Sequence, residues 1–431
     1  MKQPLPPRRV VVTGMGVVTS LGNDPEILWQ ALLAGRSGVS EIRQFDSRAF
    51  PVRIGSEVDL AALPAGANGA APGRESRSLR FGLHALDRAW EAAGLDGIPL
   101  NRRRAGVCVG ASTSPAEEGD LAIQLELATQ DDPRQSLAIF RRHPHLLAGV
   151  DIASVSTRLS DRRQLGGVSM TVQTACASAT QAAGEAFALI RAGRADLMIT
   201  GGTDSMMSVL SVAGFTLLGA LSQRRDDPAR ASRPFDARRD GFVLGEGAGI
   251  LVFEELGHAL ARGAPILAEV IGYGSSSDGY RFTDVHPEGR GAIACMRAAL
   301  ANAGIRPDQV GYVNAHGTST VQNDRVEALA IQEVFGRGAR RPPVSSSKSQ
   351  LGHLVCAAGG VELVVTVLAL RAGILPPTLN LDYPDPECDW DFVPNEPRRA
   401  EVEVALSNSF GFGGQNGTVV VRRWDPATAA A

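Results

Sequence analysis

The feature that most constrains the fold is an internal repeat, in which a helix rich in alanine and glycine twice follows a chemically reactive residue. The first copy places Cys176 before a predicted helix over 177–190, and the second places His353 before a predicted helix over 354–370. Both helices contain Ala-Ala-Gly followed closely by Glu, and both end in Arg-Ala-Gly, where the glycine suits a helix C-terminus. The chain is therefore expected to consist of two related halves.

Small residues along the two repeated helices predict where these helices lie. Side chains this small let two helices approach closely, which suits the middle layer of a five-layer α/β/α/β/α core. The chain also begins as an α/β fold does, with a β-branched run over 9–14 and a helical pattern over 27–33. Its 431 residues are enough for two or three lobes. We predict an N-terminal half over 1–260 that carries the cysteine, and a C-terminal half over 261–431 that carries two histidines.

The charge composition excludes several partners and chemistries. The 43 basic and 46 acidic residues give a net charge of −3, which offers no basic field for nucleic acid or an anionic membrane. Every basic residue is arginine except Lys2 and Lys348. Lys348 follows three serines rather than a glycine-rich phosphate loop, so P-loop nucleotide chemistry is excluded. A mid-chain lysine in so arginine-rich a sequence indicates a site that needs a compact positive charge, with a solvated surface lysine as the alternative.

Cysteine usage and apolar stretches predict the compartment. The five cysteines are scattered and include no Cys-x-x-Cys pair, so neither a disulfide framework nor a zinc finger is expected. Residues 1–14 lack the apolar core of a signal peptide. The longest apolar stretch, 354–370, contains Glu362 and is short for a membrane span. We expect a soluble, cytoplasmic protein with no membrane partner.

Four residues form a candidate catalytic set. Cys176 lies at the predicted start of a helix, where free N–H groups and the helix dipole are expected to lower the thiol pKa. His316 follows a predicted strand over 311–315, and strand ends are where α/β folds collect their sites. His353 begins a helix, whose positive end should keep the imidazole neutral. Lys348 completes the set, and no helical pair of histidines suggests a metal.

The stretch over 409–417 is too rich in glycine for an ordinary core strand. Its backbone N–H groups are suited to line an oxyanion hole, and a tight hairpin is the plainer alternative. Cys108 and Cys356 lie in apolar surroundings and are expected to be core residues.

Together these residues resemble the β-ketoacyl-acyl carrier protein synthases, condensing enzymes of the thiolase superfamily, and most of all the elongating type I/II ketosynthases. The matching stretches follow the family's order over nearly the whole chain. They are Thr174-Ala175-Cys176-Ala177-Ser178, the run from Asp240 to Gly249, the run from Val313 to Thr320, Lys348 with Gly352-His353, and the run from Asn408 to Gly414. The resemblance implies a thiolase-like five-layer fold.

The resemblance also implies a decarboxylative Claisen condensation, in fatty-acid or polyketide synthesis. An acyl group would move from the phosphopantetheine thiol of an acyl carrier protein to Cys176, and malonyl-acyl carrier protein would then lose CO₂ and attack it. His316 and His353 would assist the decarboxylation, while the N–H groups of Cys176 and Phe410 would hold the oxyanion. Negative charge develops on a thioester oxygen in both steps, and neutral imidazole donors stabilise that charge as it appears.

Supporting roles follow from the same resemblance. Lys348 would balance charge with Glu362, and Thr318 and Thr320 would bind the pantetheine arm. No metal and no soluble cofactor would be required. Gly219 stands where a basic contact with the carrier protein is frequent, and the expected substitutes are Arg224 and Arg225, or Arg74, Arg77 and Arg80.

Two departures from the family pattern bear on substrate and assembly. The segment over 140–167 matches poorly to the stretch that lines the acyl pocket and the subunit interface in the family. Thr113 stands where the elongating enzymes often place an apolar gate, which favours a short, polar or polyunsaturated primer. The resemblance predicts a homodimer, with a heterodimer with a ketosynthase-like subunit as the alternative.

Two other functions compete with this prediction. A chain-length-factor subunit pairs with a catalytic ketosynthase but lacks the nucleophile, which Cys176 argues against. A cysteine hydrolase is the other, because His316 lies about 140 residues after Cys176, as in papain-like enzymes. A hydrolase would not require a second histidine or Lys348.

Overall fold

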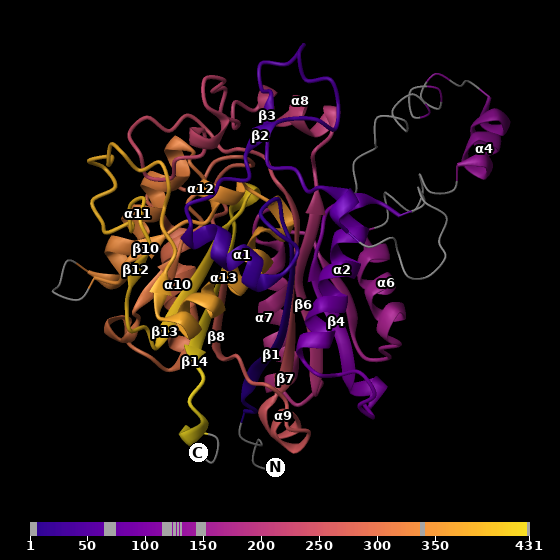
Figure 1. Cartoon of the computed structure of the whole chain (residues 1–431), viewed down its shortest axis with the longest axis vertical. Coiled ribbons are helices and arrows are strands. Elements are labelled where there is room, and N and C mark those ends of the chain that lie inside the picture. Colours follow the sequence, from indigo (N-terminus) through magenta and orange to yellow (C-terminus); the bar gives the residue numbers. More distant parts are fainter. Residues whose placement is uncertain are drawn as a thin grey trace.

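The computed structural model describes residues 7–63, 75–113, 132–143, 152–336 and 341–428, together with the isolated residues 123, 126 and 129 (Figure 1). Its core is one hydrogen-bonded sheet of ten strands in the order β10-β9-β13-β14-β8-β1-β7-β6-β4-β5. In chain order the strands are β1 Val10–Val18, β4 Ala105–Gly110, β5 Ser169–Val172, β6 Leu197–Ser205, β7 Glu246–Glu255, β8 Ala268–Ser277, β9 Tyr312–Asn314, β10 Val344–Ser345, β13 Val404–Phe410 and β14 Gln415–Arg423.

The ten strands form two groups of five with the same topology. In the first group β5, β4 and β6 run parallel, and β7 and β1 continue in antiparallel fashion. In the second group β10, β9 and β13 run parallel, and β14 and β8 are again antiparallel. Pairing of Val10–Val12 in β1 with Ala268–Val270 in β8 joins the two groups. The duplication predicted from the repeat is therefore present as a topology as well as a sequence pattern.

Helices cover both sides of each group of strands. On the outside of the first group lie α2 (Arg77–Ala92) and α6 (Ala153–Arg163), and on the outside of the second lie α10 (Arg290–Ala303) and α11 (Val321–Phe335). The repeated helices α7 (Ser178–Arg191) and α13 (Ala358–Ala372) contact each other and strands of both groups. The predicted five-layer α/β/α/β/α architecture is confirmed.

Glycine lets the central layer pack at backbone contact. A Cβ added at Gly360 of α13 would lie 2.4 Å from the Gly249 carbonyl oxygen of β7. Burial of α13 on all sides also explains its apolar sequence. Val355–Ala372 is the one helical segment of the described chain that is long and apolar enough to cross a membrane, and 89% of it is buried inside the protein.

The second repeated helix starts later than the sequence pattern indicates. A 3₁₀ turn, η5 (Val355–Ala357), follows His353, and α13 begins only at Ala358. Val355 has a φ of 46°, a left-handed conformation that side chains rarely adopt, so the chain turns sharply between the histidine and the helix.

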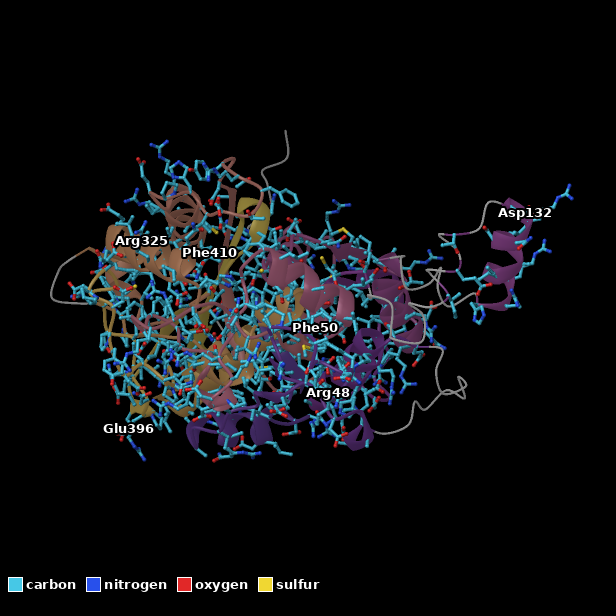
Figure 2. The ribbon with its side chains drawn as sticks, turned by 90° about the horizontal axis from the view of Figure 1, so that it is seen from above. Arg48, Phe50, Asp132, Arg325, Glu396 and Phe410 are labelled. Atoms are coloured by element: carbon cyan, nitrogen blue, oxygen red, sulfur yellow. The ribbon has the colours of Figure 1, made fainter. Side chains whose placement is uncertain are left out.

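Most of the remaining elements lie at the periphery, whereas α12 (Lys348–Leu351) is buried. The remaining elements are helices α1 (Pro25–Leu33), α4 (Pro133–Arg142), α8 (Val209–Leu217), α9 (Leu256–Ala261) and α12, strands β2 (Ser40–Glu41), β3 (Ile54–Gly55), β11 (Ile374–Leu375) and β12 (Arg398–Arg399), and short 3₁₀ turns over 60–62, 102–104, 228–230, 307–309, 412–414 and 426–428. The helix α4, with Asp132 at its start, stands apart from the layered body (Figure 2). Within the poorly matching segment over 140–167, residues 144–151 lie outside the described chain, and α6 packs on α2.

Candidate active site

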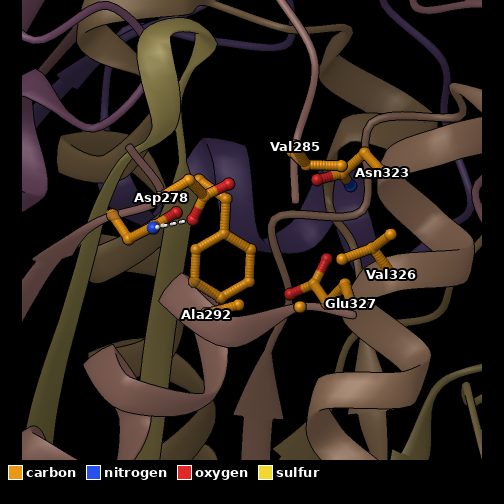
Figure 3. A pocket seen from close by; sticks show the side chains of 9 residues that line it. Asp278, Val285, Ala292, Asn323, Val326 and Glu327 are labelled. Atoms are coloured by element: carbon orange, nitrogen blue, oxygen red, sulfur yellow. Dashed lines mark hydrogen bonds between the residues drawn. The ribbon is translucent and has the colours of Figure 1, made fainter. Parts of the chain in front are cut away.

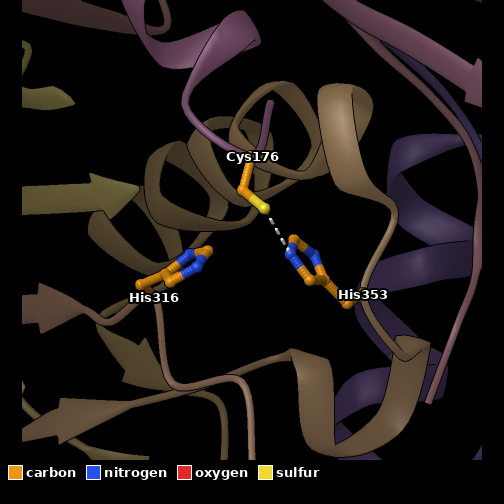
Figure 4. A group of neighbouring side chains, drawn as sticks. All are labelled: Cys176, His316 and His353. Carbon is orange, nitrogen blue, oxygen red and sulfur yellow. Dashed lines mark hydrogen bonds between the residues drawn. The ribbon is translucent and has the colours of Figure 1, made fainter. Parts of the chain in front are cut away.

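Cys176 and His353 meet at the ends of the two central helices. Cys176 directly precedes Ala177, which caps α7, and Ala175 before it has a φ of 48°, so the thiol is presented from a tight turn. His353 is held by backbone hydrogen bonds at both ends, since its N–H donates to the Val243 carbonyl and its carbonyl accepts from Gly245. The Cys176 Sγ lies 3.0 Å from His353 Nε2 (Figure 4).

His316 faces the same point from the second half of the sheet. It follows β9, as the predicted strand end requires, and its ring lies 5.3 Å from the His353 ring at 83°. The reactive atoms of Cys176, His316 and His353 all lie within 4.8 Å of one another, and all three side chains are buried. Residues about 180 positions apart in the chain thus converge on one site.

Lys348 lies next to His316 and is buried, with 2% of its surface exposed. Its ammonium group is 3.4 Å from His316 Nδ1 and forms an ion pair with Glu362 of α13. A lysine in this position is not a solvated surface residue. The structure therefore brings Cys176, His316, His353, Lys348 and Glu362 into one cluster.

Burial sets the charge state of the two imidazoles. Loss of solvent lowers the pKa of His316 and of His353 well below the usual value, and the nearby Lys348 charge lowers both further. Both rings are therefore neutral at pH 7, as predicted. The physical cause differs from the prediction for His353, because burial and Lys348 rather than a helix terminus disfavour the charged ring.

The prediction of a lowered thiol pKa is wrong. Burial raises the pKa of Cys176 to about 11, although hydrogen bonding from the Phe412 N–H and the Lys348 charge act in the opposite direction. The thiol pKa is also raised by burial in Cys108, Cys295, Cys356 and Cys388, the first two and the last to about 12. What distinguishes Cys176 is its contact with an imidazole, which can take up the thiol proton.

The glycine-rich stretch over 409–417 supplies a backbone N–H donor to the site, but from Phe412 rather than from Phe410, which the family resemblance implied. Phe412, two residues after Phe410, directs its N–H to the Cys176 sulfur, and the N–H of Cys176 itself also favours the thiolate. Phe410 ends β13, with its ring 6.1 Å from that of His316. The structure therefore moves the candidate oxyanion donor from Phe410 to Phe412.

Of the expected substrate-binding residues, two lie at the site. The Thr318 and Thr320 hydroxyl groups are 2.9 Å apart, on the loop that follows His316. Asp324 accepts the N–H groups of Thr318 and Ser319 and so shapes this loop. Thr113 is exposed in the single chain and lies outside the cluster, although the neighbouring Ser112 is buried.

Two buried carboxylates at the site were not anticipated. Glu327 accepts the N–H groups of His316 and Gly317 at 2.8 and 2.7 Å, and burial raises its pKa to about 7. It also lines a pocket with Asp278 and Phe410 (Figure 3). Asp204, at the end of β6, accepts hydrogen bonds close to Cys176. A signal for Glu327 existed in the sequence, because it interrupts the apolar face of a helix pattern over 326–331.

A cysteine and two histidines are also a zinc ligand set. The Lys348 ammonium, 3.4 Å from His316 Nδ1, would repel a divalent cation bound there. The donor set is therefore poorly suited to a resident metal, and the absence of a metal requirement stays a prediction.

Comparison with known proteins identifies the family. The model described as "Beta-ketoacyl synthase, N-terminal domain" matches residues 7–259, and "Beta-ketoacyl synthase, C-terminal domain" matches residues 267–382. The chain belongs to the β-ketoacyl synthase family. This β-ketoacyl synthase is 42% identical to the 3-oxoacyl-[acyl-carrier-protein] synthase 2 of Coxiella burnetii, over 96% of this chain and 99% of the relative.

Solved structures agree with this assignment. A β-ketoacyl synthase from Burkholderia phymatum superposes with a TM-score of 0.86 and 35% identity, covering 97% of this chain and 100% of that one. A ketosynthase chain from a complex with its type II polyketide acyl carrier protein gives a TM-score of 0.85 and 34% identity at the same coverage. This β-ketoacyl synthase is an acyltransferase with the thiolase fold, and neither the chain-length-factor nor the hydrolase alternative is favoured.

Proposed function

We propose that this β-ketoacyl synthase elongates an acyl chain held on Cys176 by decarboxylative condensation with malonyl-acyl carrier protein, releasing β-ketoacyl-acyl carrier protein and CO₂. The observation that carries the proposal is the 3.0 Å contact of Cys176 Sγ with His353 Nε2, beside a second neutral histidine. Two imidazoles and one thiol in a buried cluster suit a reaction that attacks one thioester and decarboxylates another.

In the first step, the Cys176 sulfur attacks the acyl thioester of the carrier protein. A C–S bond to Cys176 forms, the bond to the pantetheine sulfur breaks, and the thiol proton passes to the departing thiolate. His353 is placed to carry that proton, because its Nε2 lies against the sulfur. The N–H groups of Cys176 and Phe412 are suited to hold the negative oxygen of the tetrahedral intermediate.

In the second step, malonyl-acyl carrier protein loses CO₂ when the bond between its α-carbon and carboxylate breaks. The electron pair passes to the thioester oxygen as an enolate, which His316 and His353 stabilise as neutral hydrogen-bond donors. The enolate carbon then attacks the acyl carbonyl carbon, the C–S bond to Cys176 breaks, and the released thiolate takes up one proton from solvent to restore the thiol. Burial and the charge of Lys348, which is paired with Glu362, keep the pKa of both imidazoles low and so keep the rings neutral.

The carrier protein would deliver its substrates on a phosphopantetheine arm. Thr318 and Thr320 offer hydroxyl groups on the loop after His316 to bind that arm, and the reaction needs no other cofactor. The arginines expected to receive the carrier protein differ in availability. Arg77 is engaged with the buried Glu246, whereas Arg225 is exposed and donates to the Pro51 carbonyl, and Arg74 lies outside the described residues.

We also propose two thiolase-like halves over 1–260 and 261–431, a cytoplasmic location and a homodimer. The short connection between β7 and β8 supports the division, because the antiparallel topology repeats on either side of it. A ketosynthase-like partner in place of a second copy is the alternative assembly.

Purified protein incubated with an acyl carrier protein and malonyl carrier protein tests the reaction. We expect a β-ketoacyl product and CO₂ from the wild type, and neither from Cys176→Ala. Cys108→Ala, which changes a buried cysteine of β4, is the matched control and should retain turnover. Release of free fatty acid without CO₂ would indicate a hydrolase, and no reaction without a second subunit would indicate a chain-length factor.

A further inference from the structure

Asp204 is a fully buried carboxylate with no ion-pair partner among the described residues. Most other buried carboxylates are paired with a cation: Glu57, Asp236, Glu246, Glu254, Glu269, Asp324 and Glu362 each lie within 4.0 Å of an arginine or lysine. Only Glu327 shares the unpaired condition within the described chain, and it serves His316. A buried charge without a partner is costly, so its retention calls for a function.

The hydrogen bonds of Asp204 come from separate parts of the site. Its Oδ1 accepts the Ser112 hydroxyl at 2.6 Å and the Ser205 N–H at 2.9 Å. Its Oδ2 accepts the Cys356 N–H at 2.9 Å. Ser112 directly precedes Thr113, the expected end of the acyl pocket, and Cys356 lies three residues after His353.

The contact with Cys356 fixes the turn that carries His353. Cys356 is in η5, which opens the central helix, and an N–H at a helix start has no partner inside the helix. The carboxylate of Asp204, which lies in β6, accepts this N–H in place of a helical carbonyl. Val355, with its φ of 46°, is strained, and such a conformation persists only where surrounding contacts hold it, as the Asp204 contact with Cys356 does in this turn.

Asp204 also acts on the nucleophile through its charge. It is one of the groups that raise the pKa of Cys176, and it opposes the effect of Lys348 there. The other titratable groups facing the Cys176 sulfur are His316, His353 and Cys356. Burial is the main cause of the raised Cys176 pKa, and because both histidines are neutral at pH 7, Lys348 and Asp204 are the charged groups that modify it, in opposite directions. Burial also raises the pKa of Asp204, and the hydrogen bonds from Ser112, Ser205 and Cys356 oppose that shift by favouring the carboxylate.

We propose that Asp204 is a positioning residue, which holds His353 against Cys176 through the Cys356 N–H and joins that turn to the acyl-pocket end through Ser112. The proposal rests on the proposed condensation only for its kinetic consequence. Its geometric part concerns the resting protein and is measurable without turnover.

The test is Asp204→Asn, followed by the pH dependence of Cys176 alkylation with iodoacetamide. Loss of the negative charge should move the alkylation midpoint down by about 1 pH unit. Asp204→Glu, which restores the charge, should return the midpoint toward the wild type. In condensation assays Asp204→Asn should lower kcat about 10- to 100-fold with little change in KM for malonyl carrier protein, because the misplaced histidine acts after binding.

Asp236→Asn is the control for a merely structural role. Asp236 is also buried and accepts several N–H groups, but it pairs with Arg233 in another loop. This variant should lower thermal stability and leave the alkylation midpoint unchanged. An unchanged midpoint together with an unchanged kcat in Asp204→Asn would overturn the proposal, whereas a shifted midpoint in a protein that never condenses would refute only the proposed function.

Ser112→Ala keeps the proposal testable if Asp204→Asn does not fold. This variant retains the carboxylate and its bond to Cys356, and removes only the link toward Thr113. The ratio of kcat/KM between short and long primers should change about tenfold, with the alkylation midpoint unmoved. Wild-type primer selectivity would contradict the link.

Discussion

At the scale of single residues, burial rather than helix dipoles determines the chemistry of the site. The same loss of solvent raises the pKa of the Cys176 thiol and lowers the pKa of His316 and His353. All three groups are therefore neutral in the resting enzyme. Negative charge develops on the sulfur or on a thioester oxygen only during the reaction. Neutral hydrogen-bond donors therefore stabilise the transition state more than the resting state, which is how they increase the rate.

Cys176 should be the cysteine that iodoacetamide or an acyl thioester modifies first near pH 7. Its proton has an acceptor at 3.0 Å in His353, and its sulfur has the Phe412 N–H as a donor. Mass spectrometry of tryptic peptides after brief labelling measures this. Prior labelling of Cys108 or Cys356 would show that contact with an imidazole does not govern reactivity here.

Protonation of the two histidines should not lower the turnover number as the pH decreases from 8 to about 6. A histidine with the ordinary pKa of about 6.5 would gain a proton in this range and lose its function as a neutral donor. Burial and the Lys348 charge lower the pKa of both histidines well below that value, so they stay neutral. Glu327, with its pKa of about 7, also titrates in this range, so the kcat profile of the Glu327→Gln variant is the control. A break near pH 6.5 that persists in this variant would show that at least one imidazole is exposed to solvent during turnover.

Lys348→Arg should lower the rate of condensation about 100-fold, equivalent to about 2.7 kcal/mol of barrier, even though the charge is retained. The ammonium occupies a buried space between His316 and Glu362, where a planar guanidinium does not fit. Initial rates with saturating malonyl carrier protein test this. Near wild-type turnover would mean that only the charge matters.

At the scale of elements, the two central helices bring Cys176 and the turn that carries His353 together. The helices α7 and α13 contact each other between the two groups of strands, so the residues at their N-terminal ends meet. This packing depends on glycine where helix and strand backbones touch. A helix displaced by a side chain would move Cys176 or His353 as well.

Gly360→Ala should therefore destabilise the protein by about 1–3 kcal/mol. The added Cβ would lie 2.4 Å from the Gly249 carbonyl oxygen, and a backbone atom cannot move away cheaply. Gly214→Ala in α8 is the control, because its Cβ would meet nothing within 4 Å and alanine should stabilise that helix by about 0.5–1 kcal/mol. Denaturant unfolding of both variants measures the difference, and equal stability would contradict backbone contact at Gly360.

At the scale of the whole molecule, we predict that the end of the acyl pocket at Thr113 and the assembly are linked. Thr113 is exposed in the single chain, while the adjoining Ser112 is buried with its hydroxyl committed to Asp204. A second subunit would cover Thr113 if the predicted interface lies there. The Ser112 hydroxyl already donates to Asp204, so the Thr113 hydroxyl needs a hydrogen-bond partner other than Ser112 once a second subunit covers it.

We expect a homodimer by sedimentation, with low kcat/KM for long saturated primers that improves in Thr113→Ile. An unpaired buried hydroxyl costs roughly 1–3 kcal/mol, which an isoleucine would remove. Monomers in solution, or a preference for long saturated primers that Thr113→Ile does not alter, would contradict the polar pocket end.

The sequence by itself determined the repeat, the layered class and the candidate set of Cys176, His316, His353 and Lys348, because these depend on local patterns. The small residues of the two helices, the position of Cys176 before a helix and of His316 after a strand, and a rare lysine at 348 are all readable along the chain. Only the tertiary structure decided the electrostatics and the backbone donors. Burial reversed the expected shift of the Cys176 pKa, and the hairpin geometry placed Phe412 rather than Phe410 at the sulfur. Desolvation and contacts between distant segments depend on what the folded chain packs around each group. The contact of Asp204 with Cys356 is an example, because the two residues are 152 positions apart and the sequence around Asp204 does not indicate its partner.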